Sequence, residues 1–224
     1  MNHAQYGGLN VHPSLLPDLR GPAPIEHAIL KRRTHTGISI QTLHPEHFDQ
    51  GIILAQTPAP GIELSTKAHQ LESVLARRGA DMLVQLLIAR KFVPPLKDVG
   101  WYASANGPVD HAPKITKQHH FIDFSKATMD QVRATHAALG SLWCFLPNGD
   151  RLIIHDVNCS SLTSPNRTPG IWVQDGYDFP LFTAACGTTG SILKSTYSGG
   201  KTNKGNAKLL RLIPAIPAQK NDMI

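Results

Sequence analysis

The chain has 224 residues, of which 41% are hydrophobic and 17% charged, a balance typical of a folded globular protein. This length holds one large domain or two small ones. The formal net charge is +6, and no apolar run approaches the ~20 residues that span a bilayer, so we expect no membrane partner. Three cysteines without a Cys-x-x-Cys pair argue against a disulfide framework or a zinc ribbon and favour a reducing compartment.

The segment from Asn10 to Pro17 supplies an amide and an imidazole two positions apart. In extended chain Asn10 and His12 project to one face, and Pro13 favours extended backbone at His12. An imidazole can take a proton from an attacking amine, and an amide can stabilise an oxyanion. If folding brings Asp49 close, its carboxylate would fix the tautomer of His12. These three side chains predict transfer of a one-carbon acyl group to an amine.

Plainer interpretations stand beside this one. A histidine taken alone is more often an ordinary polar group than a catalyst, and it is Asn10 and Asp49 that favour the functional interpretation of His12. Leu15 and Leu16 could belong to the core or to a ligand site. Four other histidines lack the carboxylate and cysteine context of a zinc site, so we expect no metal there. They are His44, His47, His119 and His120.

The first half of the chain alternates between predicted helices and strands. Pro22-Ala23-Pro24 can open a helix, residues 38–42 and 52–54 are typical of strands, and a long helix could start at Ser65 or Thr66. Its predicted buried stripe consists of Leu71, Val74, Leu75, Met82, Leu83 and Leu86. This alternation predicts a mostly parallel sheet covered by helices, with ligands bound beyond the carboxyl ends of the strands.

Residues 95–110 are rich in proline, glycine and asparagine and predict a linker. Beyond it, Thr128-x-x-Gln131 is a capping box that predicts the start of a helix. Short segments rich in β-forming residues follow at 152–154, 170–173 and 191–193, and their spacing predicts a small barrel.

Positive charge is concentrated near the C-terminus. No acidic residue lies between Asp178 and Asp222, and the +6 of that segment equals the charge of the whole chain. Residues 198–206 form a predicted flexible basic loop suited to phosphates, although a basic segment can also serve solubility alone. The candidate RNA-binding residues are Lys194, Lys201, Lys204, Lys208 and Arg211.

Four motifs occur in an order that resembles the folate-dependent formyltransferases, and within them the enzymes that act on methionyl-tRNA: residues 10–17, 20–25, 36–38 and 49–54. The resemblance implies a catalytic trio with His12 as general base, Asn10 as oxyanion stabiliser and Asp49 orienting His12. It also implies a folate-binding loop of Ser14, Leu15, Leu16 and Pro17. Asp18 departs from the family, which often has a basic or bulky residue there.

For the fold, the resemblance implies an α/β protein: a truncated Rossmann-like parallel-sheet formyltransferase domain over 1–94, the linker at 95–110, a β-rich OB-like tRNA-binding domain over 111–213, and a tail at 214–224. For the function, it implies formyl transfer from 10-formyltetrahydrofolate to the amino group of methionyl-tRNA in translation initiation. We expect a monomer in the mitochondrial matrix, or in the cytoplasm if the source is bacterial.

A second interpretation is a catalytically inactive tRNA-binding fragment. Only nine residues precede Asn10, whereas the family has several strands and helices before this motif. We therefore expect the chain alone not to turn over the donor, whether its short start is natural or a truncated gene model. Purine-pathway formyltransferases carry the same trio but have no need of an added basic domain.

Overall fold

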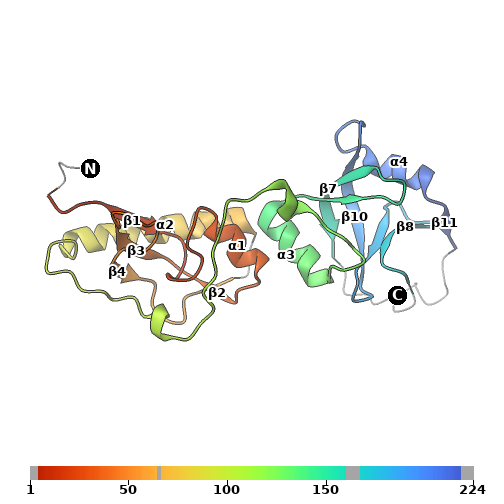
Figure 1. Ribbon diagram of the computed structural model, residues 1–224. Helices are drawn as coiled ribbons and strands as arrows, with labels where there is room; N and C mark the ends of the chain where they lie inside the picture. Colours follow the sequence, from red (N-terminus) through yellow and green to blue (C-terminus); the bar gives the residue numbers. More distant parts are fainter. Residues whose placement is uncertain (1–4, 65–66, 160–166, 218–224) are drawn as a thin grey trace. The chain divides into compact units, whose positions relative to one another are not determined.

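The structure is a computed structural model that describes residues 5–64, 67–159 and 167–217 (Figure 1). The chain divides into two compact units, residues 1–115 and 116–224. None of the helices among the described residues is long and apolar enough to cross a membrane. Each unit has its own sheet and helices and is described here by itself.

The first unit is built around a three-stranded sheet in the order β1-β3-β4. A second pair of short strands, β2 and β5, and two helices complete its regular structure. The strands are β1 (Leu9–His12), β2 (His35–Thr36), β3 (Ser39–Thr42), β4 (Ile53–Gln56) and β5 (Ile62–Glu63), and the helices are α1 (Pro24–Leu30), α2 (Ala68–Ile88) and the short 3-10 helix η1 (Tyr102–Ser104).

The predicted α/β class is confirmed, but the predicted parallel sheet is wrong for the described part of this unit. β1 pairs with β3, β3 with β4 and β2 with β5, and all three pairs are antiparallel. The segment that joins β3 to β4, residues 43–52, contains no helix. A parallel crossover needs a dozen or more residues and usually a helix, so this short connection can only return the chain as an antiparallel neighbour.

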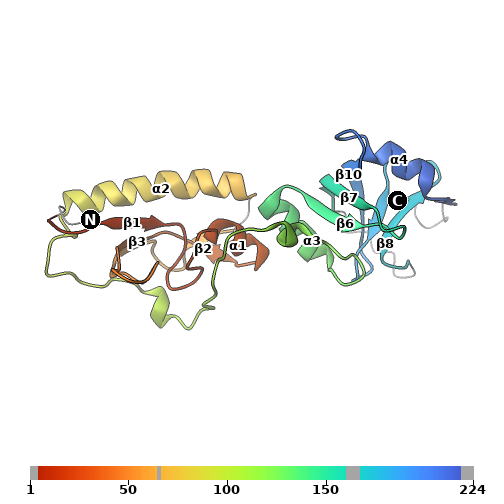
Figure 2. The same cartoon turned by 45° about the horizontal axis from the view of Figure 1, so that its top comes forward.

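Helix α2 packs against β3 and β4 and runs alongside the sheet (Figure 2). The predicted stripe is partly confirmed: Leu71, Leu75 and Leu86 are buried, whereas Val74 is 41% exposed. Gly79 lies where an added Cβ would come within 2.9 Å of Val11 Cγ1, so glycine lets the helix backbone approach β1. The helix begins at Ala68, and the two predicted N-caps fall outside the described residues.

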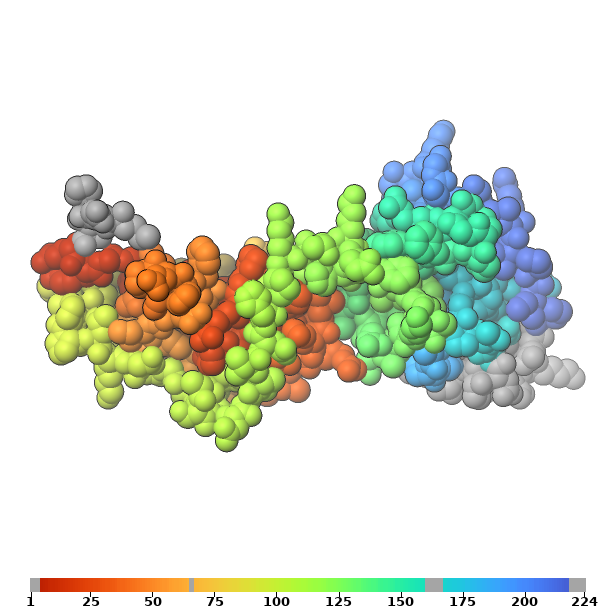
Figure 3. Space-filling view, in the orientation of Figure 1, coloured from red at the N-terminus to blue at the C-terminus, as the bar shows by residue number. Residues whose placement is uncertain are grey.

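Residues 95–110, predicted as a linker, are part of the first unit. Val99 N donates to Ile53 O at 2.8 Å, and Trp101 Nε1 donates to Thr57 O at 2.7 Å. Figure 3 shows this yellow-green segment packed against the red and orange atoms of the unit. The segment, although rich in proline and glycine, therefore runs along the surface of the first unit. The division between the units lies at 115/116.

The second unit is a six-stranded sheet in the order β11-β8-β9-β10-β7-β6, with helices α3 and α4. Neighbouring strands are antiparallel except β11, which pairs parallel with β8. The elements are η2 (Lys117–His120), α3 (Met129–Leu139), β6 (Leu142–Phe145), β7 (Arg151–Asn158), β8 (Gly170–Gln174), β9 (Leu181–Thr183), β10 (Thr189–Tyr197), α4 (Gly205–Leu212) and β11 (Ala215–Ile216).

Two local predictions in this unit have clear outcomes. The capping box is confirmed, because Thr128 Oγ1 accepts from Gln131 N and Gln131 Oε1 accepts from Thr128 N. Within the predicted tail at 214–224, β11 pairs with β8 at the edge of the sheet, while residues 218–224 fall outside the described residues. A β-rich second unit is confirmed.

Candidate active site

The first unit brings Asn10, His12 and Asp49 together. β1 is extended, as Pro13 predicted, and carries Asn10 and His12 towards the segment that joins β3 to β4. Asn10 Nδ2 donates to Asp49 Oδ1 at 3.1 Å, and His12 Nδ1 lies 3.5 Å from the same oxygen. The Asp49 side chain is only 10% exposed. An amide, an imidazole and a carboxylate therefore form one connected cluster.

Asp49 is the centre of this cluster. Its Oδ1 also accepts from Gln41 Nε2 at 3.0 Å, and its Oδ2 accepts from Gly21 N at 2.9 Å. Its backbone carbonyl accepts from Arg20 Nε. The residue has φ +55, a left-handed conformation that Asp tolerates better than most side chains. These partners hold the carboxylate in one orientation beside β1.

Gln41 and Gly21 were not among the predicted site residues. Gln41 lies on β3 directly across from Asn10 in the strand register, and its Oε1 accepts from Gly51 N at 3.0 Å. The sequence offered only a weak signal, a glutamine among the alternating polar and apolar residues of the predicted strand 38–42. In the structure this glutamine is buried, and a buried polar side chain needs partners. Gln41 thus anchors both ends of the Asp49–Gly51 turn.

The second nitrogen of His12 is also engaged. His12 is 5% exposed, and its Nε2 lies 3.0 Å from the carbonyl oxygen of Leu19. Both ring nitrogens therefore face oxygen acceptors, Asp49 Oδ1 and Leu19 O. A neutral imidazole has one N–H and can donate to only one of them, whereas the protonated ring can donate to both. Leu19, a residue that the motifs did not single out, belongs to the surroundings of the base.

Three of the four predicted folate-loop residues lie in the core. Ser14, Leu15 and Leu16 are at most 3% exposed, and Pro17 is half-buried. Ser14 Oγ donates to Asp18 O, and Leu16 N donates to Ser39 Oγ at 3.0 Å. These side chains and hydrogen bonds shape the loop from within. The structure thus shows a core position for the two leucines.

The four histidines at which we expected no metal have hydrogen-bonding or stacking partners within the protein. His44 and His47 stack with ring centroids 5.1 Å apart, His119 Nδ1 accepts from Thr116 N, and His120 lies within hydrogen-bonding distance of Ser141 O. In the described ranges no three histidine, cysteine or acidic side chains come together as a metal site would require.

The five predicted RNA-binding cations are exposed on the second unit. Lys204 is the N-cap residue of α4, and Lys208 and Arg211 follow on the helix at intervals of four and three residues, which place them on one face. Asn206 Nδ2 donates to Ile192 O and Leu193 O and fastens α4 to β10. The helix thereby presents a row of three positive charges.

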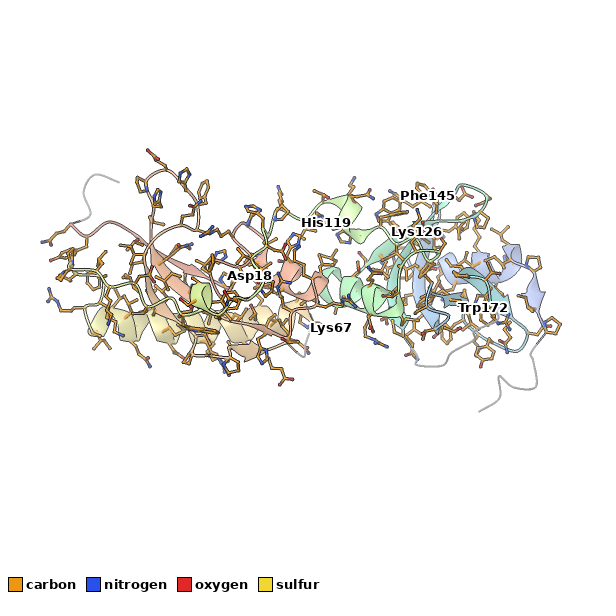
Figure 4. All side chains as sticks on the ribbon, turned by 60° about the horizontal axis from the view of Figure 1, so that its bottom comes forward. Asp18, Lys67, His119, Lys126, Phe145 and Trp172 are labelled. Carbon is orange, nitrogen blue, oxygen red and sulfur yellow. The ribbon has the colours of Figure 1, made fainter. Side chains whose placement is uncertain are left out.

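An aromatic pocket of about 810 Å³ lies elsewhere on the second unit. Its lining includes Phe145, which is 60% exposed, and Trp172, both labelled in Figure 4. The guanidinium of Arg167 lies 3.7 Å from the centroid of the Trp172 ring. The pocket joins segments around residues 121, 145 and 170 that no local sequence pattern connects.

Comparison with known proteins defines the class. Residues 1–87 match the family described as formyl transferase, so the unit that carries the trio is a formyl transferase domain. Over a longer stretch the chain resembles methionyl-tRNA formyltransferases. It is 39% identical over 179 residues to the mitochondrial enzyme of Mus musculus, covering 77% of this chain and 44% of that one.

Two further relatives have the same name. The mitochondrial methionyl-tRNA formyltransferase of Saccharomyces cerevisiae is 63% identical over 156 residues, 61% of this chain and 38% of that one. The enzyme of the bacterium Rhizorhabdus wittichii is 34% identical over 220 residues, 96% and 65% respectively. The chain thus spans less than two thirds of the length of these relatives.

Solved structures share the fold. HypX from Aquifex aeolicus in complex with tetrahydrofolic acid superposes with a TM-score of 0.62 at 12% identity, covering 94% of this chain and 36% of that one. An N-formyltransferase from Helicobacter canadensis in complex with folinic acid and dTDP-3-aminofucose has a TM-score of 0.57 at 16% identity, covering 82% and 65%. Both structures show a formyltransferase-like α/β fold over most of this chain.

Proposed function

We propose that this protein transfers a formyl group from 10-formyltetrahydrofolate to the amino group of methionyl-tRNA. The observation that carries the proposal is the convergence of Asn10 and His12 on Asp49 within the formyl transferase domain. The names of the relatives support methionyl-tRNA as the acceptor, and the folate compounds in the two solved structures support a folate as the donor.

The geometry gives each member of the trio a role. One Nδ2 hydrogen of Asn10 is donated to Asp49, and the other is available for the oxygen of a formyl group under attack. As the amine nitrogen bonds to the formyl carbon, the ring nitrogen of His12 that carries no hydrogen accepts the amine proton, and the carbonyl π electrons become the oxyanion. When that oxyanion collapses, the bond to N10 of the folate breaks and His12 returns the proton to that nitrogen.

Asp49 and Leu19 each offer an oxygen acceptor to one ring nitrogen of His12. Once protonated, the imidazolium can donate to Asp49 Oδ1 through Nδ1 and to Leu19 O through Nε2 at the same time. The neutral ring can satisfy only one of these acceptors. Three neutral donors on the Asp49 carboxylate, from Asn10, Gln41 and Gly21, keep it oriented for this purpose. Asp49 therefore positions and stabilises the base without itself moving a proton.

The second unit supplies a surface for the acceptor. The row formed by Lys204, Lys208 and Arg211 on α4 suits a phosphate backbone, since such contacts dominate nucleic-acid affinity. An OB-like fold for the β-rich unit is part of this proposal. The alternative, a tRNA-binding fragment without formyl transfer, rests on the same row of charges. The mitochondrial relatives support a mitochondrial location, with a bacterial cytoplasm as the alternative.

A formylation assay with two acceptors tests the function. Methionyl-tRNA and a nucleoside-diphosphate amino sugar, the kind of compound in the Helicobacter canadensis structure, are compared with 10-formyltetrahydrofolate as donor. The assay uses the chain itself and the chain fused behind the part of the yeast relative that precedes the Asn-x-His motif. We expect formyl transfer to methionyl-tRNA in at least one form. Transfer to neither acceptor together with tight tRNA binding would establish the fragment interpretation instead.

A further inference from the structure

Asp18, the residue that departs from the family pattern, lies at the buried end of a partly exposed ion-pair network. It is 4% exposed, and its carboxylate accepts hydrogen bonds from Arg33 Nε at 2.9 Å and from Arg33 Nη2 at 3.2 Å. Arg33 Nη2 also donates to Asp110 Oδ2, and Lys31 Nζ lies 3.2 Å from Asp110 Oδ1. Figure 4 shows Asp18 inside the first unit. The network joins the loop after the trio's strand to α1 and to residue 110.

The backbone follows the same connection. Asp110 N donates to Asp18 Oδ1 at 2.8 Å, and Leu19 N donates to Asp110 O at 2.8 Å. Ala112 N donates to Arg20 O at 2.7 Å, so residues 110–112 run along residues 19–20 as a short parallel bridge. The side-chain ion pairs and these backbone bonds hold residues 18–20 against residues 110–112, two segments some ninety residues apart in sequence. We call this set of contacts the clamp.

Leu19 links this clamp to the base. Its N–H is held by Asp110 O, and its own carbonyl faces His12 Nε2 at 3.0 Å. Leu19 has φ +58, a conformation that a leucine adopts only when its surroundings impose it. With Asp18 fixed on one side and Arg20 on the other, the carbonyl has one direction available to it. Its aim at Nε2 therefore depends on the clamp.

We propose that Arg33 is a positioning residue, which fixes the Leu19 carbonyl against His12 Nε2 through its bonds to Asp18 and Asp110. The meaning of this role for catalysis depends on the proposed function, in which His12 is the base. Arginine suits the task because its planar fork binds Asp18 through two nitrogens while also reaching Asp110. A lysine keeps the charge but cannot reproduce that geometry.

The charge arrangement also explains why an acid at position 18 is tolerated. A buried carboxylate without partners is strongly unfavourable, but this one accepts from two guanidinium nitrogens and a backbone N–H. Exchanging the two residues would instead place a carboxylate opposite that of Asp110 and a guanidinium opposite Asp110 N–H, so the network requires the acid at position 18 and the arginine at position 33.

The test observes the imidazole directly, in the full chain labelled with ¹⁵N-histidine. The Nε2–H of His12 is assigned by its disappearance in His12→Gln. In Arg33→Lys we expect its exchange with solvent to accelerate about tenfold or more, while the backbone amides of β1 and β3 exchange as in the wild type. Arg133→Lys, in the exposed ion pair with Asp130, is the matched control and should change neither.

The outcomes separate positioning from simple stability. If imidazole and amide exchange accelerate together, Arg33 is a structural residue only and the proposal is overturned; unchanged imidazole exchange overturns it as well. Should Arg33→Lys fail to fold, Asp110→Asn decides in the same way, because its side chain is 41% exposed. In the formylation assay Arg33→Lys should lower kcat by about 10–100-fold with little change in the donor's KM, since small misplacements have such costs. If the wild-type protein formylates no acceptor, the proposed function is contradicted. The exchange rate of the His12 Nε2–H still decides whether Arg33 positions the Leu19 carbonyl.

Discussion

Replacing Asp49 by asparagine should destabilise the first unit far more than an equally small change elsewhere in it. The carboxylate accepts from Asn10 Nδ2 and Gln41 Nε2 on Oδ1 and from Gly21 N on Oδ2. The new amide has one acceptor oxygen, so its NH2 must face donors on one side or the other. The less costly arrangement points the oxygen at Asn10 and Gln41 and leaves Gly21 N–H opposite another donor.

The magnitude follows from those contacts. An unsatisfied, partly buried N–H costs about 1–3 kcal/mol. The two remaining hydrogen bonds lose their charged acceptor. A hydrogen bond to a charged group contributes about 1.5–3 kcal/mol and one between neutral groups about 1 kcal/mol, so each bond weakens by roughly 1 kcal/mol. Together they predict a loss of about 3–5 kcal/mol. Asp98→Asn is the matched control, because Asp98 Oδ1 accepts only from Gly100 N in an exposed turn, and should cost at most about 1 kcal/mol.

Hydrogen exchange read by mass spectrometry, on peptides that span β1 and β3, measures the opening free energy of this unit separately from the second unit. A loss in Asp49→Asn no larger than in Asp98→Asn would refute the view that Asp49 is the hydrogen-bonding centre of the site. The same result would also remove the reason to expect Asp49 to orient His12.

Three further outcomes are expected. Neutralising Lys201, Lys204 and Lys208 together should weaken tRNA binding. The slope of log binding constant against log salt concentration should fall by about 0.9 per lost duplex phosphate contact, and an unchanged slope would contradict their role. Burial raises the pKa of Cys144 to about 12, whereas hydrogen bonding, first to Thr188, lowers that of Cys186, so iodoacetamide near pH 8 should alkylate Cys186 first. Hydrogen bonds from Arg33 and Lys31 lower the pKa of Asp110, so its stabilisation is complete above the unfolded value of about 3.9 and is lost as pH falls through the lower folded value. Asp110→Asn should therefore flatten the acid limb of the stability curve, and an unaltered limb would show that the interaction is absent in solution.

Local chemistry made part of this structure predictable. Pro13 predicted the extended chain at His12, and Thr128 with Gln131 predicted the start of α3. The grouping of Asn10, His12 and Asp49 was expected from the motifs, and the structure places the three in contact. In each case the signal lies in a few neighbouring residues, or in a short motif that carries its own chemical requirement.

The rest depends on contacts that no local pattern contains. Strand direction is set by the connection, so residues 38–42 and 52–54 look the same in a parallel or an antiparallel sheet. Asp18 meets Asp110 across 92 positions, and the partner of His12 Nε2 is a backbone carbonyl, which every residue possesses. The 95–110 segment has the composition of a spacer, yet Trp101 fastens it to the first unit.

Single-turnover formylation of methionyl-tRNA by wild type and by His12→Ala tests the central claim most directly, in whichever form of the chain transfers formyl groups. Loss of a general base typically costs about 10²–10⁴-fold. We expect a fall of that size, with tRNA affinity within about twofold of wild type because the row of cations lies on α4 in the second unit. Near-normal transfer by His12→Ala would contradict the assignment of His12 as the base.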